Sequence, residues 1–176
     1  MKWHGDIDVR LKIKTLRVGG VEQEEDVDLG TVPAEYTASS IKGLLRKAAK
    51  RVSNSLGIKG FDREIFGDAD SEGRIQIIVK STPKSEKEKR YGVKIDPSTS
   101  SVKSGHLFSY NFLTLDELCF TLRPLLGFKK DEAEFLFYAL NYLRYETLGG
   151  FGSRGIGLIE DVEICEDFLK FLGVKK

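Results

Sequence analysis

Apolar and polar residues alternate strictly near the start of the chain. Ile7, Val9, Leu11 and Ile13 are separated by charged residues, and this period of two is typical of a strand with one buried face. The glycine pair at 19–20 ends the pattern. We therefore predict a strand over residues 7–13.

Two longer stretches carry apolar residues at helical spacing. The first follows Ser39 or Ser40, either of which can cap a helix, and closes at Gly57. The second begins near Asp131 and ends near Leu148. The predicted core positions are Ile41, Leu44, Leu45, Ala48, Val52 and Leu56 in the first helix and Ala133, Leu136, Phe137, Leu140, Tyr142 and Leu143 in the second.

The remaining patterns predict further strands at residues 73–80, 91–96, 106–112 and 118–122, a closing strand over 156–164 and a short tail helix around Phe168. The polar segment 97–101 predicts a projecting hairpin. Residues 81–90 are rich in Ser, Lys and Glu, which indicates a flexible insertion.

The resulting order is β-α-β, insertion, β-α-β, which is the ferredoxin-like split unit. We predict an α+β fold: one ferredoxin-like (RRM-like) βαββαβ domain over residues 1–176, with a projecting hairpin, or thumb, inserted at 81–105. A length of 176 residues supports one well-buried core.

Charge is balanced overall but clustered locally. The chain has 28 Lys and Arg against 27 Asp and Glu, a formal net charge of +1, so the molecule as a whole has no basic field. A run of acids (Glu22, Glu24, Glu25, Asp26 and Asp28) is followed by a run of bases without an acid between them (Lys42, Arg46, Lys47, Lys50 and Arg51). Because Lys42, Arg46 and Lys50 stand four residues apart, they share a helix face that can follow an anionic polymer.

The cysteines and the N-terminus limit the class of protein. Cys119 and Cys165 lie in apolar runs without metal-ligand spacing, which indicates reduced core residues. The first residues lack a signal-peptide core, and no apolar run reaches the length of a membrane span. We expect a soluble protein in the cytoplasm, with no membrane partner.

The segment 148–157 holds five glycines in nine residues around Arg154. Gly150, Gly152 and Gly155 match G-x-G-x-x-G, but a dinucleotide fingerprint follows a strand and opens a helix, and here the order is reversed. Such a backbone can adopt positive φ and offer N–H groups to an anion, with phosphate as the obvious candidate. An ordinary helix-to-strand connection would explain one or two of these glycines.

Five elements in the same order resemble the RAMP superfamily of CRISPR-associated proteins. They are 16–20 after the first strand, Ser39 to Arg46, Phe66-Gly67-Asp68 leading into 73–75, 93–96 through 105–108, and the glycine segment. Within the superfamily, the resemblance is greatest to the repeated backbone subunit of type III (Csm/Cmr-like) RNA-guided effector complexes. Thr37-Ala38 stand where that family usually has Pro-Gly.

The resemblance implies that copies of the chain stack along a CRISPR guide RNA, together with other RAMP subunits and a large effector subunit, and face a complementary target RNA. A thumb within 81–105 would push between bases. RNA contacts would come from Ser39, Ser40, Lys42, Arg46 and Lys50 on the basic helix and from Gly150, Gly152, Ser153, Arg154 and Gly155 in the glycine segment.

The family cuts target RNA with an aspartate in the loop before the basic helix. Val27-Asp28-Leu29 fits that setting better than the residues around Asp26, so Asp28 is the implied catalytic residue and Asp26 the runner-up. A carboxylate there could hold Mg²⁺ or another divalent ion, or position the 2′-hydroxyl for attack. The acidic run could also be an ordinary solvated loop.

Three alternatives remain open. A CRISPR-RNA-processing endonuclease shares the fold and the glycine loop, but it usually needs a catalytic histidine and two ferredoxin-like halves, whereas only His4 and His106 are present here. A catalytically inactive structural subunit of the same kind of complex would have a similar sequence. An RRM-type module would show aromatic residues on a central strand, and 75–79 has none.

Overall fold

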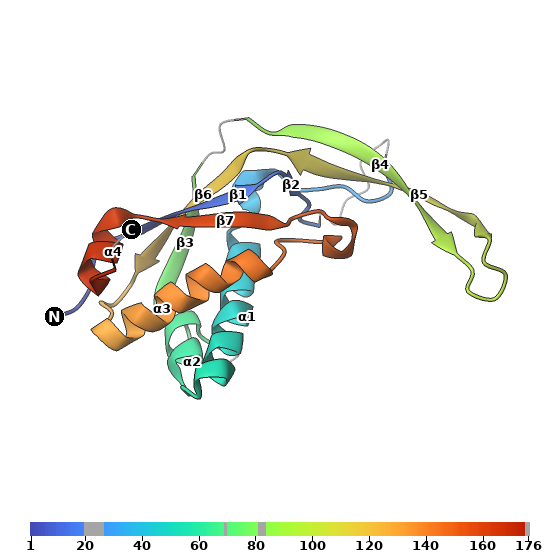
Figure 1. Ribbon diagram of the computed structural model, residues 1–176. Coiled ribbons are helices and arrows are strands. Elements are labelled where there is room, and N and C mark those ends of the chain that lie inside the picture. The colour runs from blue at the N-terminus through green and yellow to red at the C-terminus, as the bar shows by residue number, and fades with distance from the viewer. Residues whose placement is uncertain (20–26, 69, 81–83, 175–176) are drawn as a thin grey trace.

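The computed structural model describes residues 1–19, 27–68, 70–80 and 84–174. A four-stranded sheet forms the body, with the order β3 (Ile75–Val79), β6 (Glu117–Pro124), β1 (Ile7–Ile13) and β7 (Ile159–Ile164). Every neighbouring pair is antiparallel. Helices α1 (Ala38–Leu56) and α3 (Lys130–Tyr142) lie together on one face of this sheet (Figure 1).

The chain order of these elements is β1-α1-β3-β6-α3-β7, and the sheet order puts β1 and β6 in the centre. This is the ferredoxin-like βαββαβ arrangement, so the fold class predicted from the sequence is confirmed. The short helices α2 (Phe61–Phe66) and α4 (Glu166–Leu172) complete the body.

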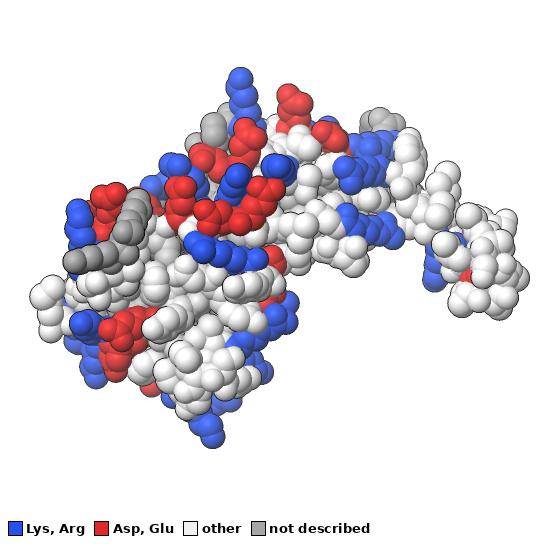
Figure 2. Space-filling view, in the orientation of Figure 1, with Lys and Arg blue, Asp and Glu red and all other residues white. Residues whose placement is uncertain are grey.

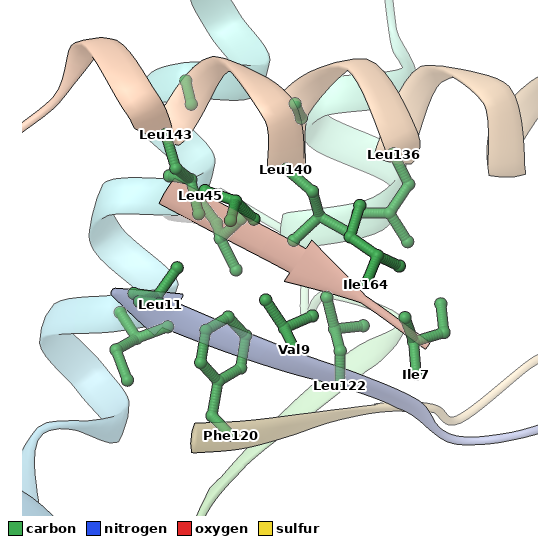
Figure 3. Close-up of a cluster of buried hydrophobic side chains, with 14 of the residues drawn as sticks. Ile7, Val9, Leu11, Leu45, Phe120, Leu122, Leu136, Leu140, Leu143 and Ile164 are labelled. Carbon is green, nitrogen blue, oxygen red and sulfur yellow. The ribbon is translucent and has the colours of Figure 1, made fainter. Parts of the chain in front are cut away.

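The core forms between the sheet and the two long helices. All four apolar residues of β1 are buried and its polar residues are exposed, as the alternation predicted. They pack against Leu45 of α1 and Leu136 and Leu140 of α3 (Figure 3). Leu56 does not join this core, because its side chain is 51% exposed at the end of α1.

Strands β4 (Glu86–Ile95) and β5 (Val102–Thr114) form a long hairpin that projects from the body as an arm (Figure 1). Together with the two-residue strand β2 (Thr15–Leu16) they make a second sheet, ordered β2-β5-β4. The polar turn between the strands is as predicted. Residues 86–90 are strand rather than flexible insertion, because they pair with β5 up to Thr114, so the hairpin extends beyond the expected 81–105.

The ends of several elements differ from the sequence-based expectation. Helix α1 begins at Ala38, and neither Ser39 nor Ser40 caps it. Thr37 precedes the helix, and its hydroxyl donates to the carbonyl of Ala34 at 2.6 Å. This bond closes a 3-10 turn over Ala34–Tyr36, so a tight turn forms without Pro-Gly. Helix α3 ends at Tyr142 and continues as a 3-10 turn, Leu143–Tyr145.

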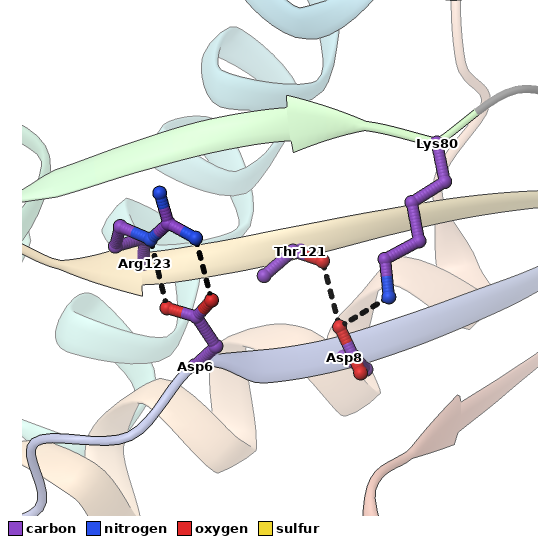
Figure 4. Close-up of polar contacts among 5 residues, drawn as sticks. All are labelled: Asp6, Asp8, Lys80, Thr121 and Arg123. Carbon is purple, nitrogen blue, oxygen red and sulfur yellow. Dashed lines mark hydrogen bonds and ion pairs between the residues drawn. The ribbon is translucent and has the colours of Figure 1, made fainter.

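The outer face of the main sheet is covered by ion pairs. Asp6 accepts two hydrogen bonds from Arg123, and Asp8 accepts from Lys80 at 2.8 Å and from Thr121 at 2.6 Å (Figure 4). These contacts lower the pKa of both carboxyl groups. Acidic and basic side chains are accordingly intermingled on the body, whereas the arm is mostly uncharged toward its tip (Figure 2). The aromatic base-stacking surface of an RRM is absent from the described strands of this sheet.

Candidate functional site

A hollow of about 900 Å³ runs along the first half of α1. Ser39, Lys42, Gly43 and Arg46 line one wall of it, because residues three and four apart share a helix face. Ser40 is half-buried and outside this lining, and Lys50 is exposed one turn further along the helix. The predicted face of Lys42, Arg46 and Lys50 is therefore present, but only two of its members reach the hollow.

The other bases of α1 have a structural task. Lys47 donates to Glu146 at 2.9 Å, and Arg51 pairs with the other oxygen of the same carboxylate. The side chain of Glu146 is only 4% exposed, so the two cations neutralise a buried charge. No such pair is found for Lys42, Arg46 or Lys50 within the described part of the chain. The sequence did not separate the two groups of bases, because the carboxylate that pairs with Lys47 and Arg51 lies 95 or more positions along the chain.

The wall opposite α1 is a tight acidic turn. A Cβ on Gly67 would lie 2.4 Å from the amide nitrogen of Gly73, so packing of the turn requires glycine at this position. Asp68 accepts hydrogen bonds from the hydroxyl and amide of Ser71 and from the amide of Asp70, which lower the pKa of its carboxyl group. The Phe66-Gly67-Asp68 motif therefore shapes this turn, and the hollow has one basic and one acidic wall.

Packing inside the chain accounts for much of the glycine segment. A Cβ on Gly149 would lie 2.1 Å from the carbonyl oxygen of Arg17, and one on Gly157 would lie 2.0 Å from that of Leu148. Both residues also have positive φ, of 82° and 79°. A Cβ on Gly152 would meet Thr147 at 2.5 Å. These glycines are weaker evidence for a ligand than the sequence suggested.

Several amides of the segment already have acceptors. Each donates to a backbone carbonyl oxygen: the amide of Gly150 to that of Arg17 at 2.7 Å, the amide of Arg154 to that of Phe151 at 2.8 Å, and the amide of Gly155 to that of Gly152 at 3.0 Å. The predicted contact between Gly150 or Gly155 and RNA through these amides stays a prediction. Ser153, Arg154 and Gly155 are exposed, so a ligand can reach them.

Arg154 stands against aromatic rings at the base of the arm. Its guanidinium lies 5.2 Å from the ring centre of Phe108, 5.7 Å from that of Tyr110 and 4.8 Å from that of Phe151. Such cation–π contacts fix the side chain while leaving its charge available. Phe108 and Tyr110 are on β5, so the glycine segment and the arm form one surface.

Asp28 lies beside β5 as well. Its Oδ2 accepts the amide of Ser109 at 2.6 Å and the Ser109 hydroxyl at 3.0 Å, and these bonds lower the pKa of the Asp28 carboxyl. Asp28 is exposed and ionised at neutral pH. Asp26 and the six residues before it lie outside the described residues.

The described residues do not by themselves make a metal centre. No group of three or more His, Cys, Asp or Glu side chains comes together among them. A divalent ion at Asp28 would need further ligands, which phosphate oxygens and water can supply. The two histidines are not brought together either: His4 packs against Gly127, and His106 is on β5 in the arm.

Sequence reasoning missed Arg17. It follows β2 and is only 7% exposed, yet its guanidinium lies 4.7 Å from the ring centre of Phe151 in the glycine segment. It also donates to the carbonyl of Gly30 at 3.2 Å. Its position between Leu16 and Val18 was the sequence signal that could have identified it. Arg17 joins the segment that carries Asp28 to the glycine loop.

Comparisons with known proteins place these features in a family. The model of the RAMP superfamily matches residues 12–160, which is most of the chain. The chain therefore belongs to the RAMP superfamily. A search of curated proteins gave no match.

Among solved structures, the chain is similar to one in a cryo-EM structure of the type III-B Cmr-beta complex bound to cognate target RNA. The TM-score is 0.59 at 16% sequence identity, over 90% of this chain and 60% of the other. The protein thus spans about 60% of the length of the chain that it matches. This likeness confirms the fold. No helix in the described part of the chain is long and apolar enough to cross a membrane.

Proposed function

We propose that this protein is a CRISPR-RNA-binding backbone subunit of a type III RNA-guided interference complex. Membership of the RAMP superfamily and the fold shared with a chain of a target-RNA-bound Cmr complex support the class. The observation that carries the proposal is the open basic edge of α1, where Lys42 and Arg46 line a hollow without an ion pair among the described residues. Arg154 on the glycine segment adds a third cation.

These cations suit a phosphate backbone better than base edges. Lysine and arginine contacts to phosphate position a nucleic acid without reading its sequence, which is what a subunit that accepts any guide requires. The partners on this account are a guide RNA, a complementary target RNA, further copies of the chain, and other RAMP and large effector subunits. The cytoplasm is where such a complex would meet RNA.

The arm supports a repeated array. It exposes large apolar side chains on both strands, including Tyr91 at 65%, Ile95 at 59% and Leu107 at 65%. An isolated two-stranded hairpin is marginally stable in water, and exposed apolar strips mark contact surfaces. Contacts of one copy with a different surface of the next build open filaments.

Light scattering of the purified chain on single-stranded RNAs of increasing length tests the array. We expect the mass of the complex to grow with RNA length. The matched control shortens the arm by joining Gly92 to Phe108, which pair across the hairpin, through an Asn-Gly turn. The shortened protein should bind RNA without forming arrays. A one-to-one complex of the wild-type chain at every length contradicts the proposal.

A second activity, cleavage of the target RNA, is proposed for Asp28. The supporting observation is that Ser109 holds this exposed carboxylate at the base of the arm, where bound RNA would pass. The proposed activity is that of a divalent-ion-dependent endoribonuclease, in which Asp28 and phosphate oxygens of the RNA would together hold the ion. An inactive scaffold subunit and a guide-processing endonuclease are the alternatives.

Within an assembled guide complex, Asp28→Ala should abolish cutting of a complementary RNA and preserve guide and target binding. Removing a carboxylate does not weaken the attraction of a surface for an anion. Gel analysis of labelled target with and without Mg²⁺ measures the cutting. Equal cutting by the variant and the wild type would reject Asp28, and Asp26→Ala then separates a misplaced assignment from an inactive subunit.

A further inference from the structure

Among the described residues, Arg17 is the one basic residue that is buried, with 7% of its surface exposed. One terminal nitrogen donates to the carbonyl of Gly30 at 3.2 Å. Its Nε is buried and has no hydrogen-bond partner in the described part of the chain. No carboxylate of the described residues forms an ion pair with it.

Burial of a guanidinium in this way is costly. A buried charge without an opposite charge loses its hydration and gains little in return, and burial accordingly lowers the pKa of Arg17. An apolar residue of similar volume would pack at this position at lower cost. The guanidinium, which no described carboxylate compensates, can therefore accept an anionic partner from outside the described residues.

Phe151 covers the guanidinium on the side of the glycine segment. Its ring centre lies 4.7 Å from Arg17 and 4.8 Å from Arg154, so two like charges contact one ring. Phe151 has a φ of 64°, a left-handed conformation that is unfavourable for a residue with a side chain. The neighbouring Gly150 leaves the guanidinium uncovered on its own side, since a Cβ there would lie 3.2 Å from Nη1.

We propose that Arg17 is an inner phosphate-binding residue of the glycine segment, which Phe151 shields until RNA binds. A phosphodiester group of the RNA supplies the negative charge that no described carboxylate provides, and it lies between Arg17 and Arg154. This inference rests on the proposed function and adds a ligand contact to it. Guanidinium binds phosphate through two parallel hydrogen bonds, which would also satisfy the orphaned Nε.

The competing explanation is that Arg17 only fastens the 27–31 segment to the glycine segment. A fastening role needs the hydrogen bond to Gly30 and the packing against Phe151, but it needs no charge. The two roles therefore differ in the salt dependence of RNA binding, because each phosphate contact to single-stranded RNA contributes about 0.7 to the slope of log affinity against log salt concentration.

The test measures binding of a uridine-only single-stranded RNA over a range of salt concentrations, with Arg17→Gln and Arg17→Lys beside the wild type. We expect Arg17→Gln to lower the slope by about 0.7 and Arg17→Lys to keep it. The matched control is Arg144→Gln: Arg144 also donates to a backbone carbonyl at 3.2 Å, but it has Asp161 at 3.1 Å as a partner. Its slope should equal that of the wild type.

A folded Arg17→Gln protein with the wild-type slope overturns the inference and leaves the proposed function standing. If the wild-type chain does not bind RNA at all, the proposed function fails and the inference fails with it. Thermal melting without RNA establishes which variants fold. Should Arg17→Gln not fold, Phe151→Gly decides. It removes the shield and the backbone strain, so RNA affinity should exceed that of the wild type, and an equal or lower affinity overturns the inference.

Discussion

Gly43 shows at the scale of one residue how the hollow differs from an ordinary helix face. It lies inside α1, where glycine costs about 0.5–1 kcal/mol relative to alanine. A Cβ at this position would meet nothing within 4 Å, so packing within the described residues does not require glycine. Gly43 lines the hollow between Lys42 and Arg46, where a bound RNA backbone would profit from a close approach.

We expect Gly43→Ala to raise stability and lower RNA affinity at the same time. The free energy of unfolding should rise by about 0.5–1 kcal/mol because alanine favours the helix. The affinity should fall because a methyl group enters the contact surface. Denaturant unfolding and RNA binding at one salt concentration measure the two effects. Equal or tighter binding by a more stable Gly43→Ala protein would show that RNA does not lie over this position.

At the scale of the element, the bases of α1 fall into two groups with different surroundings. Lys47 and Arg51 neutralise the buried Glu146, whereas Lys42 and Arg46 face the hollow. Glu146 lies two residues before the glycine segment, so its two ion pairs also fix α1 relative to that loop. One face of α1 therefore stabilises the fold, and the other is the face for which we propose RNA binding.

Replacement of Lys47 and Arg51 together by Met should destabilise the protein without changing the salt slope of RNA binding. The expected loss is about 2 kcal/mol, below that for a fully buried ion pair because both cations are half-exposed. The matched variant is Lys42→Met with Arg46→Met. It should lower the salt slope of RNA binding without destabilising the protein. Thermal melting and salt titration separate the two. A reduced slope in the Lys47 and Arg51 variant would mean that these residues also contact RNA.

The sequence predicted the elements better than the site. The alternation in β1 and the helical spacing in α1 follow from burial on one face, which a local pattern records. The partners of Lys47 and Arg51, the occupied amides of Gly150 and Gly155, and the buried position of Arg17 depend on segments that meet only in the folded chain. The sequence predicted residues 86–90 as part of a flexible insertion, because a solvent-exposed strand lacks the apolar alternation of a half-buried one.

The whole molecule has almost no net charge, with a formal value of +1. On the outer face of the main sheet, acids and bases neutralise each other in pairs such as Arg10 with Glu117 and Arg123 with Asp6. Long-range attraction would therefore contribute little, and the proposed RNA binding would depend on the local cations of α1 and the glycine segment.

The central claim is that these local cations hold RNA through its phosphates. The most direct measurement is the affinity of Arg46→Ala/Arg154→Ala for single-stranded RNAs of different sequence over a range of salt concentrations. Arg10→Ala/Arg123→Ala, which removes the same charge from the outer sheet face, is the control. We predict an equal loss of affinity on every RNA and a slope lower by about 1.4, for two lost phosphate contacts, with no such change in the control. Wild-type affinity of the Arg46 and Arg154 variant at low salt would contradict the account.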